Sequence, residues 1–161
     1  MFIKMVKDTN VELKSLYIES TAKTPQIDLN NLTGDLILSG RSIPENAGKL
    51  YEGVLKWINE YITNPRLTTN LRLNLEYFNT SSSIWIAKIV KALCSIKDRE
   101  NTVIIHLYFS IEDFDNMDVE ELKDELHPII HLVETPTVSL GIKLYGTDDK
   151  GKILKESMVL I

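Results

Sequence analysis

LRLNLEYFNTSSSIW, residues 71–85, is the stretch in which a strand pattern passes directly into a helix pattern. Leu71, Leu73 and Leu75 alternate with polar residues, which is typical of a β-strand with one covered face. Asn79 and a run of four hydroxyl side chains follow, and the pattern then becomes helical. A strand that leads straight into a helix predicts an α/β architecture.

The hydroxyl run from Thr80 to Ser83 is open to four interpretations: a helix cap, a catalytic nucleophile, an anion-binding turn or a phosphorylation site. Asn, Ser and Thr are preferred N-cap residues, and one cap contributes about 1 kcal/mol, but a cap uses only one side chain. A helix N-terminus also favours a phosphate, and phosphorylation would add about −1.5 to −2 charges to the turn. These residues by themselves do not decide between a helix cap and a phosphorylation site that acts as a switch.

Hydrophobic periodicity predicts the other elements of the chain. We expect strands at residues 16–19, 71–78 and 102–110, hairpins formed by 26–30 with 36–39 and by 138–145 with 153–161, and helices at 46–62, about 82–97 and 119–126. The segment from Ser42 to Glu45 has the form of a capping box for the first helix. This order predicts a single domain, residues 1–161, with a mixed sheet that carries helices mainly on one face.

The bulk composition is that of an ordinary globular protein, with 161 residues, 43% hydrophobic and 25% charged. A net charge of −5 disfavours nucleic-acid binding, which depends on Lys and Arg neutralising phosphates. No apolar run approaches the ~20 residues that span a bilayer, and no signal peptide is recognisable, so we expect a cytoplasmic bacterial protein without a membrane partner. Cys94 lies in an apolar helical pattern and is predicted to be a buried thiol.

Enzyme chemistry finds little support in the sequence. A nucleophilic Thr80 would need a histidine base, and the candidates are His106, His127 and His131. The spacing of His127 and His131 could suit a metal, but Pro128 lies between them and no third ligand has a suitable spacing. Gly-rich phosphate loops and calcium loops are also missing. We therefore expect no enzyme activity, no cofactor and no metal.

Three blocks of the sequence resemble one known family. They are LYIESTAKTPQIDLN (residues 16–30), LILSGRSIPENAGKLYEGVLKWINEYI (residues 36–62) and LRLNLEYFNTSSS (residues 71–83). The segments 40–46 and 77–83 are specific in their order and spacing. Together the blocks resemble the SiaC family of bacterial regulatory phosphoproteins over about residues 16–110.

This resemblance implies a STAS-like protein of the anti-sigma-factor antagonist type that switches between partners. By position, Thr80 would be phosphorylated by a Ser/Thr kinase of the histidine-kinase-like type, and a PPM-type phosphatase would remove the phosphate. The unphosphorylated form would bind and activate a diguanylate cyclase, in cyclic-di-GMP signalling and biofilm regulation. Ser81 and Ser82 are secondary candidates for phosphorylation or capping. The partner or kinase face is assigned to Glu45, Asn46, Asn79 and Ser83.

Two departures from the family pattern set this chain apart. Relatives usually carry a lysine directly after the three serines, where this chain has Ile84. The part from about Ile111 also differs from the usual family ending, and residues 136–161 are predicted to be a C-terminal addition. These departures motivate a second hypothesis, a constitutive protein-binding scaffold that has lost the phosphorylation switch.

Overall fold

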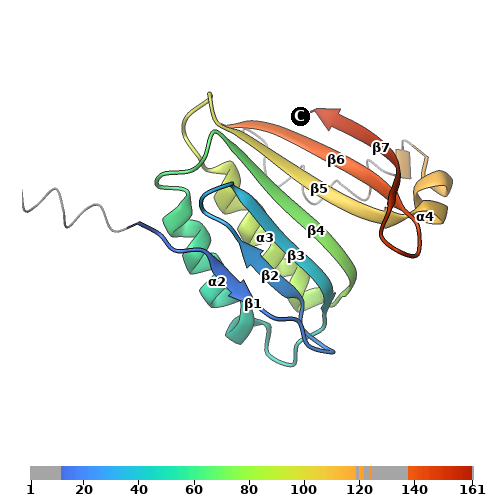
Figure 1. Ribbon diagram of the computed structural model, residues 1–161, viewed down its shortest axis with the longest axis horizontal. Coiled ribbons are helices and arrows are strands. Elements are labelled where there is room, and N and C mark those ends of the chain that lie inside the picture. The colour runs from blue at the N-terminus through green and yellow to red at the C-terminus, as the bar shows by residue number, and fades with distance from the viewer. Residues whose placement is uncertain (1–11, 119, 122–123, 125–137, 161) are drawn as a thin grey trace, which may run out of the picture.

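One mixed β-sheet organises the protein (Figure 1). The computed structural model describes residues 12–118, 120–121, 124 and 138–160. Within these residues the sheet has seven strands, whose order in space is their order in the chain. They are β1 (Leu16–Ile18), β2 (Gln26–Leu29), β3 (Asp35–Ser42), β4 (Thr68–Phe78), β5 (Thr102–Ser110), β6 (Ser139–Thr147) and β7 (Ile153–Leu160).

The strands pair antiparallel at both ends of the sheet and parallel in the middle. β1, β2 and β3 pair antiparallel, as do β6 and β7, whereas β3, β4, β5 and β6 form a parallel block. Parallel neighbours need a crossover connection, and helices α2 (Ala47–Tyr61) and α3 (Thr80–Cys94) provide the first two. The predicted mixed α/β sheet and both predicted hairpins are thus confirmed.

The two long helices pack together on the same face of the sheet (Figure 1). Apolar residues at alternate strand positions point toward them, including the fully buried Leu36, Leu71 and Ile105. On the helices, Tyr51 and Ile58 of α2 and Leu93 of α3 complete this core. Apolar residues repeat about every 3.6 positions along the helices and every second position along the strands, so each element presents one apolar face to the other. Cys94 is buried in the same cluster, and burial raises the pKa of its thiol to about 11, as expected for a structural cysteine.

The structure corrects two helix starts. The predicted capping box at Ser42 is wrong, because Ser42 is the last residue of β3 and the N-cap of α2 is Asn46, whose side chain accepts a hydrogen bond from Lys49 N. The second helix begins at Thr80, not at Ser82, and its N-cap is Asn79. In both cases an asparagine in extended conformation supplies the capping oxygen, in agreement with the high rank of Asn at this position.

The region after β5 differs in part from the sequence prediction. A short helix not predicted from the sequence, α4 (Ile111–Asn116), follows β5 directly, with Ser110 as its N-cap. Of the predicted helix at 119–126, only residues 120, 121 and 124 are described, and these are helical. The remaining part of that prediction lies outside the described residues.

The sheet face opposite α2 and α3 carries a polar and aromatic network on its central strands. His106 of β5 lies with Nε2 2.7 Å from Asn70 Oδ1 and Nδ1 2.7 Å from the Tyr145 hydroxyl. The ring of Tyr145 stacks on Tyr108, with 4.6 Å between centroids, and Arg72 donates to the Tyr108 hydroxyl. This network joins β4, β5 and β6 across the face that the two long helices leave uncovered.

Candidate phosphorylation site at the start of α3

Thr80 is the first residue of α3 and sits in a turn that is held firmly from both sides. The side-chain oxygen of Asn79 accepts a hydrogen bond of 2.9 Å from Ser82 N. The backbone N–H of Asn79 donates to the carbonyl of Ser42, and its side-chain amide donates to the carbonyl of Pro44. The turn between β4 and α3 is therefore tied to the end of β3.

The four hydroxyls of the run have different environments. Ser81 donates to Asn79 Oδ1 at 3.1 Å, and Ser83 donates to the carbonyl of Thr80 at 2.7 Å. Ser82 is fully buried and donates to the carbonyl of Ser42 at 2.9 Å. In the described part of the chain, Thr80 is the one member of the run whose hydroxyl makes no hydrogen bond, and its side chain is exposed.

A buried chain of hydroxyls lies directly beneath the turn. Ser42 Oγ is 2.6 Å from the Tyr51 hydroxyl and 2.8 Å from Ser82 Oγ. These groups come from β3, α2 and α3, so the chain joins three elements at the point where Thr80 is presented. The burial of Ser82 argues against its predicted role as a secondary phosphate acceptor, because a kinase cannot reach it in the folded protein.

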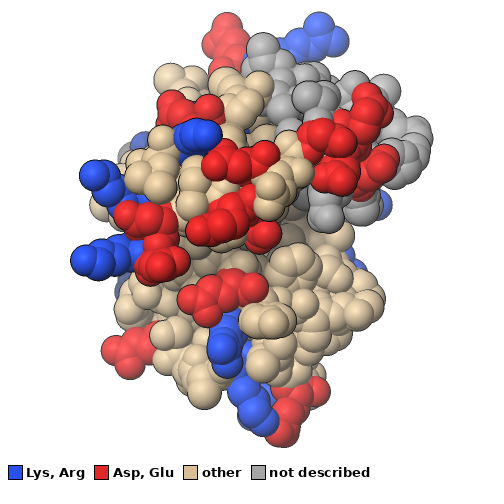
Figure 2. Space-filling model, turned by 90° about the vertical axis from the view of Figure 1, so that its right-hand side faces the viewer, with Lys and Arg blue, Asp and Glu red and all other residues tan. Residues whose placement is uncertain are grey.

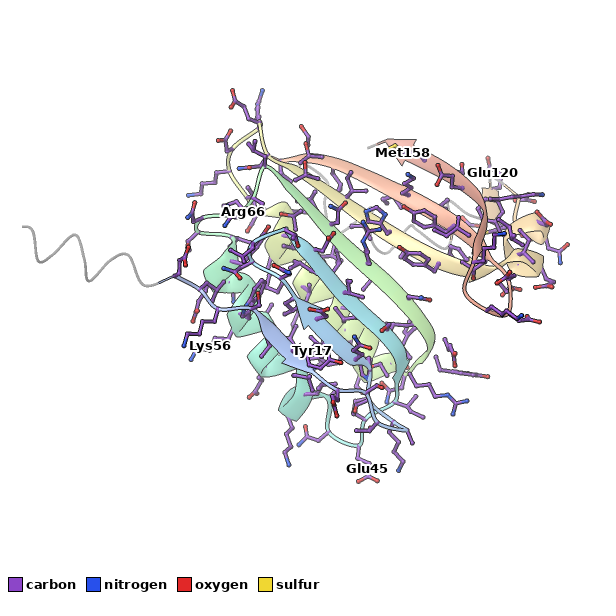
Figure 3. The ribbon with its side chains drawn as sticks, in the orientation of Figure 1. Tyr17, Glu45, Lys56, Arg66, Glu120 and Met158 are labelled. Atoms are coloured by element: carbon purple, nitrogen blue, oxygen red, sulfur yellow. The ribbon has the colours of Figure 1, made fainter. Side chains whose placement is uncertain are left out.

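The partner-face residues predicted on the preceding helix lie on the same edge of the molecule. The hydrogen bonds from Asn79 to Ser42 and Pro44 bring the start of α2 next to the start of α3. Asn46 is occupied as the cap of α2, whereas Glu45 projects into solvent and its carboxylate lies 3.2 Å from Lys23 Nζ (Figure 3). The structure thus places both residues at the edge that carries Thr80.

Exposed apolar side chains flank the Thr80 turn, a feature that sequence reasoning missed. Tyr77 and Phe78 directly precede the turn and are 65% and 54% exposed. Ile84, the fifth residue of α3, is 54% exposed, and Ile43 follows the strand residue that pairs with Phe78. We call these four residues the apolar rim. The signal in the sequence is the adjacent pair Tyr77 and Phe78 at the end of a strand, which breaks the alternation of apolar and polar residues.

The electrostatics of the turn suit an added phosphate. The first turn of α3 contains no acidic residue, and a helix N-terminus presents free N–H groups and the positive end of the helix dipole. It contains no basic side chain either, since Thr80 and the three serines are followed by Ile84. A phosphate on Thr80 would therefore rely on backbone N–H groups for stabilisation.

The described residues give no support to hydrolysis or metal binding at this site. The histidine His106 belongs to the network on the opposite sheet face, and burial lowers its pKa to about 4, with Arg72 and Lys143 nearby as additional causes. His127 and His131 lie outside the described residues. Within the described part, no group of three or more His, Cys, Asp or Glu side chains could hold a metal ion.

A surface cavity of about 980 Å³ lies elsewhere, against α2 and the segment before β1. Lys56 and Arg66 are among its lining residues, and Figure 3 shows both on the side of the molecule away from α4. Thr80 does not line this cavity. Among the described residues, no helix is long and apolar enough to cross a membrane.

Comparison with known proteins places this fold and turn in a family. The model of the family described as "SiaC family regulatory phosphoprotein" matches residues 18–135. An uncharacterized protein of Pseudomonas aeruginosa (strain UCBPP-PA14) is 33% identical over 86 residues, which are 53% of this chain and 63% of that protein. The matched part thus spans less than two thirds of this curated relative.

Solved structures agree with the family match. Apo-SiaC from Pseudomonas aeruginosa has a TM-score of 0.61 and 26% identity, covering 80% of this chain and 97% of that chain. A second structure is the diguanylate cyclase SiaD of Pseudomonas aeruginosa in complex with its activator SiaC. The match has a TM-score of 0.62 and 26% identity, and it covers 81% of this chain and 99% of that chain. The fold is that of a small α/β protein, and the chain belongs to the SiaC family of regulatory phosphoproteins.

Proposed function

We propose that this chain is a non-enzymatic signalling protein that switches partners according to the phosphorylation of Thr80, in the cytoplasm of a bacterium. The observation that carries the proposal is the contrast within the hydroxyl run. Three hydroxyls are engaged in hydrogen bonds, whereas Thr80 is exposed and unengaged among the described residues. A kinase needs a hydroxyl that it can reach at the surface of the protein.

The proposed downstream partner is a diguanylate cyclase or a similar signalling protein. Support comes from the solved complex in which SiaC of Pseudomonas aeruginosa is the activator of SiaD. The apolar rim around Thr80 has the character expected of a protein contact, in which fully buried apolar and aromatic side chains supply most of the affinity. We propose that this partner links the chain to cyclic-di-GMP signalling and biofilm regulation.

The proposed mechanism is electrostatic and steric. Phosphorylation adds about −1.5 to −2 charges in the middle of the apolar rim. Burying that charge against an apolar partner surface is costly, so the phosphorylated form releases its target. A PPM-type phosphatase would restore the neutral surface and permit docking again.

Phosphorylation of the purified chain by its Ser/Thr kinase of the histidine-kinase-like type, with ATP, tests the site. We expect phosphopeptide mass spectrometry to find one phosphate on Thr80, and Thr80→Ala to accept none. Ser81→Ala is the matched control, because it removes an exposed neighbouring hydroxyl and should leave phosphorylation unchanged. Phosphate on another residue, or normal labelling of Thr80→Ala, would contradict the assignment.

Cyclic-di-GMP synthesis by the cognate diguanylate cyclase tests the partner. Wild type and Thr80→Ala should stimulate the cyclase equally, and Thr80→Glu should lose stimulation. Stimulation by Thr80→Glu and by the enzymatically phosphorylated protein that equals the stimulation by wild type would instead favour the second candidate, a constitutive scaffold. That candidate is favoured by Ile84, which leaves the first turn of α3 without the cation that relatives usually place there.

A further inference from the structure

The sheet contains a fork between its central strands. β4 and β5 pair from Thr68↔Thr102 to Leu73↔Leu107 and then part (Figure 1). Beyond the last pair, β4 stays bonded to β3 as far as Phe78, and β5 stays bonded to β6 as far as Ser110. β5 stays in register with β6, and β4 stays paired with β3 across one β-bulge, in which Glu76 is the extra residue opposite Gly40 and Arg41. Two facing edges are thus left inside the sheet.

The β4 side of the fork has the properties of an open sheet edge. In the described part of the chain, no backbone hydrogen bond connects residues 74–78 to β5 or to any other group on that side. Asn74, Glu76, Tyr77 and Phe78 are exposed. The segment contains neither proline nor lysine, and the features that limit pairing along this edge are the β-bulge at Glu76 and its charge. Within the described residues, the N–H and C=O groups on this side of β4 form a template for a further strand.

The side chains of the fork define which strand would fit. Leu75 and Phe109 continue the helix-side positions of the last pair, Leu73 and Leu107, and are partly buried against the core. On the opposite face, Asn74 and Glu76 are exposed and polar. A strand added here would need apolar side chains toward the helices and polar ones toward the other face, in simple alternation.

The charge around the fork is acidic. Glu76 lies on β4, with its carboxylate 3.8 Å from Arg41 Nε in an exposed ion pair. Glu112 and Asp113 occupy the first turn of α4, immediately after β5 ends, and neither of them forms an ion pair among the described residues. Figure 2 views the molecule from the side of α4, and acidic side chains outnumber basic ones there. Acidic surroundings attract Lys and Arg and repel Asp and Glu, so a basic segment is favoured.

We propose that the fork between β4 and β5 is a strand-addition site, which binds an extended partner segment with alternating apolar and basic residues. Main-chain hydrogen bonds to residues 74–78 supply the affinity, and the partly buried apolar floor and Glu76 select the side chains. This site goes beyond the proposed switch, since docking at the fork uses the backbone of β4 and does not require phosphate on Thr80.

Hydrogen–deuterium exchange of the full chain with a short acetylated peptide of alternating valine and lysine tests the proposal. We expect the peptide to slow amide exchange in residues 74–78, in wild type and in Thr80→Ala alike. The same peptide with every backbone amide N-methylated keeps its charge and apolar side chains but donates no backbone hydrogen bond from either edge, and it should give no protection. No protection by the first peptide, protection elsewhere only, or equal protection by both peptides overturns the proposal.

Charge reversal provides a matched pair of variants. Glu76→Lys should weaken peptide binding several-fold, because a like charge then faces the basic residues. Glu52→Lys makes the same change at an exposed site on α2, away from the fork, and should leave binding unchanged. Equal thermal unfolding of the two variants verifies that both are folded. Equal weakening by both variants, or by neither, would show that the fork does not recognise the peptide.

Discussion

Thr80 and Ser82 are two residues apart in one helical turn, yet they have opposite environments. Thr80 is the first helical residue and points to solvent, whereas Ser82 reaches back under the turn to β3. The difference follows from helix geometry. Each residue advances about 100° around the axis, so Thr80 and Ser82 are about 200° apart and lie on nearly opposite sides of the helix. Neighbouring hydroxyl residues in this run therefore differ in function: Ser82 stabilises the fold, whereas Thr80 is exposed at the surface.

The buried hydroxyl chain predicts a cost for losing Ser82. Ser82→Ala removes the acceptor of Ser42 Oγ and a donor to the carbonyl of Ser42, in a fully buried place. We expect the free energy of unfolding to fall by about 1–3 kcal/mol, measured by urea denaturation. Ser81→Ala, at the exposed neighbour, should change it by less than about 0.5 kcal/mol. Equal effects would contradict the structural role of the chain.

Cys94 gives a second prediction at the residue scale. Burial raises the pKa of the thiol to about 11, so the reactive thiolate is scarce at neutral pH. We expect a thiol reagent such as Ellman's reagent to label Cys94 only as fast as the protein unfolds. Rapid labelling of the native chain would show that the cysteine is accessible.

At the scale of elements, capping decides where α3 begins and hence how Thr80 is presented. Asn79→Ala removes the oxygen that accepts from Ser82 N, and we expect it to cost about 1 kcal/mol in the free energy of unfolding. Thr80→Ala is the matched control, because it removes an unengaged hydroxyl from the adjacent position and should be nearly neutral. A large loss of stability in Thr80→Ala would show that the hydroxyl has a structural partner.

At the scale of the whole molecule, the network around His106 joins three central strands. Its folded pKa of about 4 is below the ordinary value of 6.5, because burial disfavours the charged ring. The stability contributed by the neutral ring is complete above about pH 6.5 and is lost as the pH falls toward 4. By linkage this loss amounts to about 3 kcal/mol.

Denaturation of wild type and His106→Gln between pH 7 and pH 4 measures this contribution. The variant lacks the titrating ring, so the difference in unfolding free energy between the two proteins should shrink as the pH falls through this range. Carboxylates that titrate near pH 4 affect both proteins and cancel in the difference. A difference that stays constant with pH would contradict the lowered pKa.

The sequence predicted most of the fold because periodicity is a local property. Alternation at residues 71–78 predicted β4, the four-residue apolar spacing predicted α2, and the turn signals predicted both hairpins. The predicted capping box at Ser42 was wrong for a tertiary reason. The Ser42 hydroxyl is buried and forms hydrogen bonds with Tyr51 and Ser82, which come from α2 and α3. Local pattern cannot show which groups from distant segments will meet.

The sequence by itself determined the order of the elements and the position of the hydroxyl turn, because both depend on neighbouring residues along the chain. Tertiary structure alone decided which hydroxyl is free, which apolar residues at the end of β4 are exposed, and where β4 and β5 part. These outcomes depend on packing between β3, α2 and α3 and on strand pairing over long separations. Long-range contacts of this kind are set by the whole fold, and no window of sequence contains them.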